Sequence, residues 1–251
     1  MRPLFSIITV TYNAGALLSK TIESVARQSC KDKEYIIIDG ASKDNTLEII
    51  QYYTEEITSY ISEPDKGIYD AMNKAFGMAT GKYILFLNAG DTFHTDDVLG
   101  KIKALIDPNN EPDIIYGETA ITDEAGNFVS MRRLKTPENL SWRSFSQGML
   151  VCHQSFMPKL DICEPYNLSY RYSADFDWCI RCMKKAKSLY NTHMIISNFL
   201  EGGVSTSQRK KSLKERYEIM CRYYGVIPTA LRHIWFAARF AFAKYITKRV
   251  N

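Results

Sequence analysis

Polar and acidic residues directly follow four strand-like segments in the first part of the chain. They are Thr11-Tyr12-Asn13, Asp39-Gly40, Glu63–Lys66 and Asn88–Asp91. Asp, Asn and Gly also favour turns and helix caps, which is the structural alternative at any one of these positions. Four such loops in succession favour a binding site.

The carboxylates in these loops indicate a metal-dependent phosphate site. The chain has no G-x-G-x-x-G after its first predicted strand and no P-loop, and the loop of residues 11–15 is poor in glycine. Acidic groups face a phosphate favourably only with a divalent cation between them. Mg²⁺ or Mn²⁺ held by one or two carboxylates and by substrate phosphates is a common arrangement.

The elements that position these loops alternate between strand and helix. Apolar runs predict strands over 5–10, 34–39, 57–62 and 82–87, and the predicted helices between them are 16–28, one ending at 53, and 68–80. Such an alternation predicts parallel strands buried on both faces. Ligands of open α/β sheets bind at the carboxyl ends of the strands, where all four loops fall.

The rest of the chain is less regular. We predict a strand at 114–117, a hairpin of 120–123 and 127–131, a helix at 173–187, a strand at 189–198 and a polar helix at 207–224. The expected organisation is one domain over 1–206, with a nucleotide-binding half (1–95) and an acceptor half (96–206). A basic, helical C-terminal region (207–251) follows it.

Composition narrows the class of protein. The chain has 251 residues, of which 45% are hydrophobic and 24% charged, which excludes disorder, collagen and coiled coil. Met1 leads directly into a strand-like segment without a signal-peptide pattern, so we expect a cytoplasmic protein with reduced cysteines. Cys179 and Cys182 have zinc-site spacing, but they lie in a helical pattern without a second pair and are interpreted as core residues.

The charge is concentrated at the C-terminus. Residues 208–251 hold eleven Lys/Arg and two Asp/Glu, a local +9, so the preceding residues sum to −5 of the total +4. An acidic body with a basic tail does not fit a nucleic-acid binder. Residues 228–249 are aromatic-rich and fall short of the ~20 apolar residues that span a bilayer. They predict a helix lying peripherally on the inner face of the plasma membrane, or packing on the body or on a second copy in a homo-oligomer.

Several of these segments together resemble family 2 glycosyltransferases. The resemblance rests on Ser6–Asn13, Glu34–Thr46 and Leu85–Asp91, and Ser62–Lys74 is similar to a subgroup found in bacterial surface-polysaccharide (colanic-acid-type) clusters. It covers roughly residues 4–205. It implies the GT-A fold, a Rossmann-like mixed central sheet flanked by helices, and an enzyme that uses nucleotide-diphosphate sugars and inverts the anomeric centre.

The resemblance also implies roles for residues in the donor half. Tyr12 would pack near the base or ribose, Asp39 would accept a hydrogen bond from uracil, and Asp65 would help to close the pocket. The implied nucleotide-binding set is Thr9, Thr11, Tyr12, Asn13, Asp39, Asp65, Lys66 and Asn88. For Asp39, a helix-capping loop residue is the alternative. The family's D-x-D metal motif is replaced here by Asn88-Ala89-Gly90-Asp91, so Asp91 with Asn88 would hold Mg²⁺ or Mn²⁺ with one formal charge fewer.

A second acidic cluster lies at the start of the helix predicted at 173–187. Asp175 matches the family's catalytic base, which takes the proton of the acceptor hydroxyl. Asp177, two residues on, would face elsewhere on a helix and suits capping or acceptor orientation. Candidates for contact with the diphosphate or the acceptor are His153, Gln154, Asp177 and Gly203.

We therefore predict an inverting glycosyltransferase that moves a sugar from a UDP-sugar to a hydroxyl of a glycan or lipid-linked oligosaccharide in polysaccharide biosynthesis. The missing acids at positions 88, 90 and 174 and the basic C-terminal tail each leave one alternative. One is a catalytically inactive protein that binds nucleotide sugar or glycan. The other is a membrane-attached assembly subunit.

Overall fold

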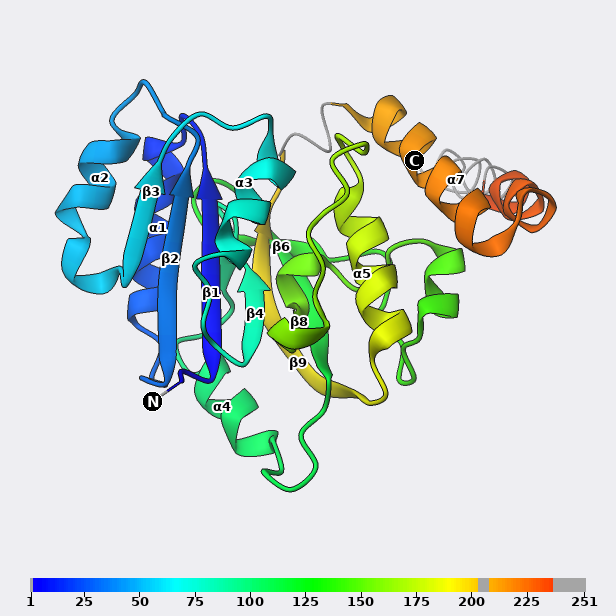
Figure 1. Cartoon of the computed structure of the whole chain (residues 1–251), viewed down its shortest axis with the longest axis horizontal. Helices are drawn as coiled ribbons and strands as arrows, with labels where there is room; N and C mark the ends of the chain where they lie inside the picture. Colours follow the sequence, from blue (N-terminus) through cyan, green and yellow to red (C-terminus); the bar gives the residue numbers. More distant parts are fainter. Residues whose placement is uncertain (1, 203–207, 237–251) are drawn as a thin grey trace, which may run out of the picture.

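The computed structural model describes residues 2–202 and 208–236 (Figure 1). Its first sheet contains four parallel strands in the order β3-β2-β1-β4: β1 (Phe5–Thr11), β2 (Lys33–Asp39), β3 (Ser59–Ser62) and β4 (Tyr83–Phe86). All seven residues of β1 are buried, as expected for a central parallel strand covered on both faces. The register pairs Thr11 with Asp39 and Asp39 with Ser62, so three predicted strand ends meet at one edge.

Helices connect these strands and cover both faces of the sheet (Figure 1). They are α1 (Gly15–Ala26), α2 (Thr46–Tyr52) and α3 (Ile68–Phe76), with the 3₁₀ turn η1 (Thr54–Glu56) before β3. Helix α1 packs Leu18, Ile22 and Val25 into one apolar cluster, while α3 packs Ala71, Met72 and Ala75 into a second. The two clusters together form the core on either side of the sheet.

The second sheet is mixed. It contains β5 (Thr92–Phe93), β6 (Ile114–Thr122), β7 (Phe128–Met131), β8 (Phe156–Pro158) and β9 (Leu189–Leu200). Strands β6 and β9 are parallel, and the other pairs are antiparallel. A bridge between Tyr83 and Lys159 joins the two sheets, and the Leu160 backbone N–H donates to the Lys82 carbonyl over 2.8 Å. The predicted mixed central sheet flanked by helices is therefore confirmed.

Further helices follow the first sheet in the chain. They are α4 (Val98–Leu105), α5 (Ala174–Lys185) and α7 (Arg209–Tyr224), with the 3₁₀ turns η2 (Trp142–Gln147), η3 (His153–Ser155) and η4 (Leu160–Ile162). Cys179 and Cys182 are buried on α5, which agrees with a core role, and all six cysteines are free. Within the described residues, no helix is both long and apolar enough to cross a membrane.

Several boundaries differ from the sequence prediction. The sequence predicts two separate segments, 114–117 and 120–123, where the structure has the single strand β6. Gly117 joins the two segments within β6. A side chain does not fit at this position, because a Cβ would lie 2.6 Å from the Met194 carbonyl oxygen of β9. Helix α4 and the short strands β5 and β8 were not predicted, since elements of two to eight residues carry little periodicity.

Candidate active site

The carboxylate of Asp39 lies fully buried at the carboxyl edge of β2. Its Oδ2 accepts hydrogen bonds from the Ser42 backbone N–H (3.1 Å) and the Ser62 hydroxyl (2.6 Å), and Oδ1 accepts from the Ser42 hydroxyl. Three donors leave about one of its four acceptor positions for a further partner. The bonds to Ser42 also close the local loop, but they do not cap a helix, because α2 begins only at Thr46. The sequence did not indicate that Ser42 and Ser62 would bind the Asp39 carboxylate.

Tyr12, Gly40 and Asp65 converge at the same edge. A Cβ built on Gly40 would lie 2.4 Å from Asp65 Oδ2 and 3.2 Å from Tyr12 Cδ2, so the two side chains close over a position that only glycine leaves open. Tyr12 is 62% exposed, which leaves its ring available for stacking. Asp65 Oδ1 accepts from the Gly67 N–H (2.8 Å), and this ties the loop to the start of α3.

The other predicted nucleotide residues have different environments. Thr11 Oγ1 is buried without a hydrogen-bond partner among the described residues, and the Lys66 side chain is exposed. Asn13 Oδ1 accepts from the Lys43 N–H (2.7 Å), so its amide holds the neighbouring loop. Thr9 lies beneath the edge: its buried hydroxyl bonds the Leu87 carbonyl (2.7 Å) and the Tyr35 hydroxyl (2.9 Å). The structure thus does not bring Thr9 to the surface of the edge.

Asn88 and Asp91 follow β4, as predicted, but within the described part of the chain only the Asp91 side-chain oxygens have hydrogen-bond partners. Asp91 is buried; one oxygen accepts from Gln154 Nε2 (2.8 Å) and the other from the Leu200 N–H (3.0 Å). Burial raises the pKa of Asp91 to about 6, against the lowering effect of these bonds. Asn88 Oδ1 is buried and has no partner among the described residues.

Whether these residues fit a metal ion depends on that Asn88 oxygen. An unpartnered amide oxygen is a ligand type that Mg²⁺ and Mn²⁺ accept. Among residues 2–202 and 208–236, no three His, Cys, Asp or Glu side chains gather into a metal-binding group. Asn88 with Asp91 therefore fits a cation only if the donor's phosphates supply further ligands.

Asp175, in the first turn of α5, is a buried carboxylate that side-chain contacts connect to Asn88. Its Oδ2 is 3.4 Å from His153 Nδ1, and its Oδ1 accepts from the Tyr69 hydroxyl (3.0 Å). His153 Nε2 lies 3.5 Å from Asn88 Nδ2, so Asp175, His153 and Asn88 form a continuous row. Burial favours protonation, but His153, the charge of Arg216 and the Tyr69 hydrogen bond together hold the pKa of Asp175 below its ordinary value. The base candidate is thus an ionised carboxylate.

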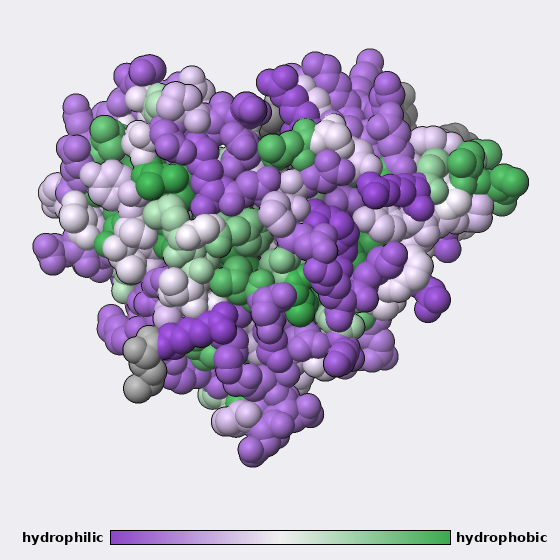
Figure 2. All heavy atoms as spheres, viewed as in Figure 1, coloured by the Kyte–Doolittle hydropathy of each residue, from purple (hydrophilic) through white to green (hydrophobic). Residues whose placement is uncertain are grey.

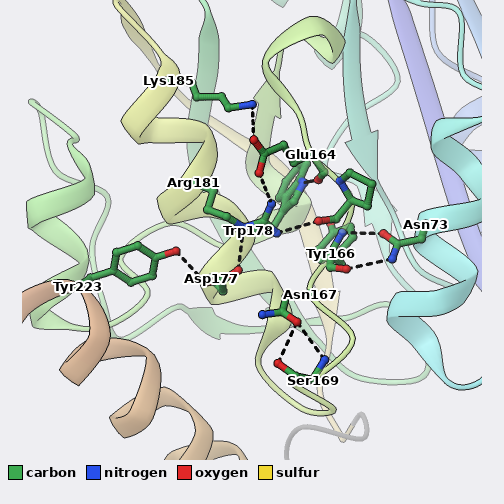
Figure 3. Close-up of polar contacts among 11 residues, drawn as sticks. Asn73, Glu164, Tyr166, Asn167, Ser169, Asp177, Trp178, Arg181, Lys185 and Tyr223 are labelled. Carbon is green, nitrogen blue, oxygen red and sulfur yellow. Dashed lines mark hydrogen bonds and ion pairs between the residues drawn. The ribbon is translucent and has the colours of Figure 1, made fainter.

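Asp177 has another environment, shown in Figure 3. Its carboxylate accepts from Arg181 Nε (2.8 Å) and from the Tyr223 hydroxyl (2.8 Å), and it is 1% exposed. The Tyr223 contact fastens α5 to α7, and the Arg181 contact lies within α5. Asp177 thus has structural partners, although neither contact caps the helix. Gln154 lies with Asp91, whereas Gly203 lies outside the described residues.

Sequence reasoning missed Tyr69 and Arg216 as neighbours of Asp175. Tyr69 stands within the segment Ser62–Lys74 that carries part of the resemblance, which was the only signal for it. No sequence pattern indicated Arg216, because its position near Asp175 depends on how α7 packs against α5.

Comparisons with known proteins identify the class of protein as a glycosyltransferase. The family model "Glycosyl transferase family 2" matches residues 6–164, so the chain belongs to this family. It is 31% identical to a "PGL/p-HBAD biosynthesis glycosyltransferase" of Mycobacterium bovis over 231 residues, which cover 88% of this chain and 86% of that protein.

Solved structures show the same fold at low identity. TarS of S. aureus in complex with UDP-GlcNAc has a TM-score of 0.67 and 19% identity, over 86% of this chain and 64% of that chain. The mannosyltransferase PcManGT of Pyrobaculum calidifontis in complex with GDP-Man and Mn²⁺ has a TM-score of 0.61 and 15% identity. The match covers 100% of this chain and 81% of that chain. The GT-A fold implied by the sequence is confirmed.

Proposed function

We propose that this glycosyltransferase moves one sugar from a UDP-sugar to a hydroxyl of a glycan or lipid-linked oligosaccharide in polysaccharide biosynthesis, inverting the anomeric carbon. The observation that carries the proposal is the row from Asn88 through His153 to the ionised Asp175. In this proposal residues 1–95 bind the donor, residues 96–206 bind the acceptor, and 207–251 form a basic helical region.

The reaction needs one carboxylate on the acceptor side. Asp175 takes the proton of the acceptor hydroxyl while that oxygen bonds to the anomeric carbon and the bond to the diphosphate breaks. The products are the glycoside and UDP, with the proton on Asp175. No second carboxylic acid is required, because the diphosphate leaves as an anion, unlike the leaving group of a glycosidase. His153 orients Asp175 on the side that faces Asn88.

The edge of the first sheet would hold the nucleotide. Tyr12 offers an exposed ring for the base, and Asp39 retains about one acceptor position, which suits the imide N–H of uracil. Asp65 and Lys66 close the loop beside Tyr12, and Thr11 Oγ1 is an unpartnered hydroxyl. The neighbour TarS, solved with UDP-GlcNAc, supports a nucleotide-sugar donor.

Asn88 and Asp91 are the proposed ligands of Mg²⁺ or Mn²⁺. Bound there, the metal would neutralise charge that develops on the diphosphate. Asn88 Oδ1 offers the unpartnered oxygen, while Asp91 is held in place by Gln154 and Leu200. The Mn²⁺ of the PcManGT complex supports a divalent metal.

The proposal is tested first by calorimetric titration of UDP, GDP and ADP, each with Mn²⁺ and with EDTA. We expect a metal-dependent preference for UDP. Binding of none of the three nucleotides would remove the donor site assigned here, and preference for GDP would move the base specificity away from Asp39.

A membrane surface is the proposed partner of the C-terminal region. Residues 226–236 are helical and carry five large apolar side chains that are 62–74% exposed: Val226, Ile227, Leu231, Ile234 and Trp235. Figure 2 shows hydrophobic atoms at this end of the molecule. Arg222 and Arg232 lie in the same region, and basic residues beside Trp and aliphatic side chains favour an anionic bilayer. The remaining tail, 237–251, lies outside the described residues.

A further inference from the structure

Tyr69 connects the donor loop to the proposed base. It lies in the first turn of α3, three residues after Lys66, and its side chain is 8% exposed. Its hydroxyl donates to Asp175 Oδ1 over 3.0 Å, from the opposite half of the molecule. The Tyr69 ring stacks on Tyr166, with centroids 5.4 Å apart and planes inclined by 26°.

The two oxygens of Asp175 have partners from different elements. Tyr69 holds Oδ1 at hydrogen-bond distance, while His153 on η3 lies 3.4 Å from Oδ2. The Tyr69 contact is the shorter of the two. His153, and through it Asn88, then lies on the Oδ2 side.

The phenol acts as a donor only. Burial and the charge of Asp175 keep the pKa of Tyr69 well above its ordinary value, so the hydroxyl keeps its proton. Helix α3 also begins at the loop where Gly67 bonds Asp65. Asp65 and Lys66, two of the residues assigned to the nucleotide, thus lie in the loop that leads directly into the turn carrying Tyr69.

We propose that Tyr69 is a positioning residue that holds Asp175 in the orientation required for proton removal. This inference rests on the proposed function, since it assumes that Asp175 is the base. The alternative is that Tyr69 only fills the aromatic core with Tyr166 and Trp178, in which case a phenyl ring would replace it without consequence.

Tyr166 provides a matched control. It is buried between Tyr69 and Trp178 in the same aromatic stack, and Figure 3 shows it beside Trp178. Its hydroxyl has no hydrogen-bond partner among the described residues. Y69F and Y166F each remove one buried hydroxyl and keep the ring. Only Y69F removes a bond to Asp175.

The first measurement needs no substrate. The carboxyl of Asp175 is titrated by ¹³C NMR in wild type, Y69F and Y166F, with the signal assigned from D175N. We expect Y69F to raise the pKa of Asp175, because a donor to the charged form is lost, while His153 and Arg216 still face it. Y166F should leave it unchanged. Equal pKa values in Y69F and wild type would overturn the inference.

The second measurement is turnover, followed as UDP release from UDP-GlcNAc, UDP-glucose and UDP-galactose with water or membrane lipids as acceptor. We expect Y69F to lower kcat about 10- to 100-fold, as a misoriented base does, with UDP affinity within about twofold of wild type. Y166F should retain kcat. An equal loss in both variants would show a packing effect and overturn the inference.

Two further variants keep the result interpretable. If D175N is fully active, the proposed function fails, whereas a dead D175N with an active Y69F defeats only the inference about Tyr69. If Y69F unfolds, 3-fluorotyrosine at position 69 keeps the ring and makes the hydroxyl a stronger donor. The pKa of Asp175 should then fall, and no change would contradict a positioning role.

Discussion

The amide of Gln154 donates a 2.8 Å hydrogen bond to the carboxylate of Asp91, although 63 positions separate them in the chain. With the Leu200 N–H on the other oxygen, Asp91 joins the loop after β4, the turn η3 and the end of β9. Burial still raises the pKa of this carboxylate to about 6, so the two neutral donors only partly offset its desolvation. Asp91 thus connects three segments of the site.

Replacing Asp175 should separate binding from chemistry. We expect D175N to lower UDP release about 10²–10⁴-fold, the typical range for a general base, and to retain UDP affinity in calorimetry. D177N is the control: it weakens the contact with Tyr223 that fastens α5 to α7 and the contact with Arg181 within α5, so it should reduce thermal stability while the folded fraction stays active. Equal activity losses in both variants would contradict the assignment of Asp175.

Gly40 should tolerate no side chain without cost to nucleotide binding. In G40A the new Cβ would stand 2.4 Å from Asp65 Oδ2, so the carboxylate must move and Tyr12 with it. We expect UDP affinity to fall about tenfold, equivalent to ~1.4 kcal/mol, with the fold preserved. G77A is the matched control, since a Cβ on Gly77 would lie 3.5 Å from the Lys74 carbonyl oxygen, an ordinary van der Waals distance. Unchanged UDP affinity in G40A would place the nucleotide elsewhere.

Asn88 should set the strength of metal dependence. N88A removes the unpartnered oxygen and should weaken Mn²⁺-supported UDP binding, whereas N88D restores a formal charge and should tighten it. Titration of UDP at a series of Mn²⁺ concentrations measures both effects, and EDTA gives the metal-free baseline. If neither substitution changes the Mn²⁺ concentration required, Asn88 is not a ligand.

Glu34 should make the fold sensitive to acid. This buried carboxylate accepts from the Ser6 hydroxyl, the Thr80 N–H and hydroxyl, and the Gly81 N–H. Burial raises the pKa of Glu34, but the hydrogen bonds together lower it by more than burial raises it. The pKa in the folded protein therefore lies below that in the unfolded chain. The stabilisation is therefore complete above the unfolded pKa near 4.5 and is lost as pH falls through the folded pKa.

E34Q tests this directly. We expect it to lower the free energy of unfolding at pH 7 by about 1–3 kcal/mol, because the amide satisfies only part of the donors, and to flatten the loss of stability below pH 5. Urea unfolding at several pH values measures both. E63Q, on an exposed glutamate, is the control. Parallel pH curves for wild type and E34Q would refute the role of Glu34.

The exposed apolar helix should bind anionic vesicles. We expect I227E/I234E, and deletion of 226–251, to reduce co-sedimentation with vesicles containing phosphatidylglycerol, because both remove apolar surface from the interface. L105E alters an apolar residue on α4, also exposed, and should bind as wild type does. If the helix variants instead change only the oligomeric state in size-exclusion chromatography, the surface is a contact between copies.

The sequence by itself determined the alternation of elements and the residues at the strand ends. Continuous apolar runs such as Ile36-Ile37-Ile38 predict strands that are buried on both faces, and these three residues are fully buried. The positions of the first four strands could therefore be predicted, although β3 is only partly buried. The spacing of Asp175 and Asp177 already indicated that the two carboxylates diverge on a helix. They do, toward Tyr69 and Tyr223 respectively.

Only the tertiary structure decided which partners these residues have. Tyr69 meets Asp175 across 106 positions and Gln154 meets Asp91 across 63, contacts that depend on how α3, α5 and η3 pack against the sheet. The same packing buries Thr9, which the resemblance had placed at the nucleotide. Local patterns record whether a residue is buried, but hydrogen-bond partners come from distant elements, and these are fixed only when the whole sheet is assembled.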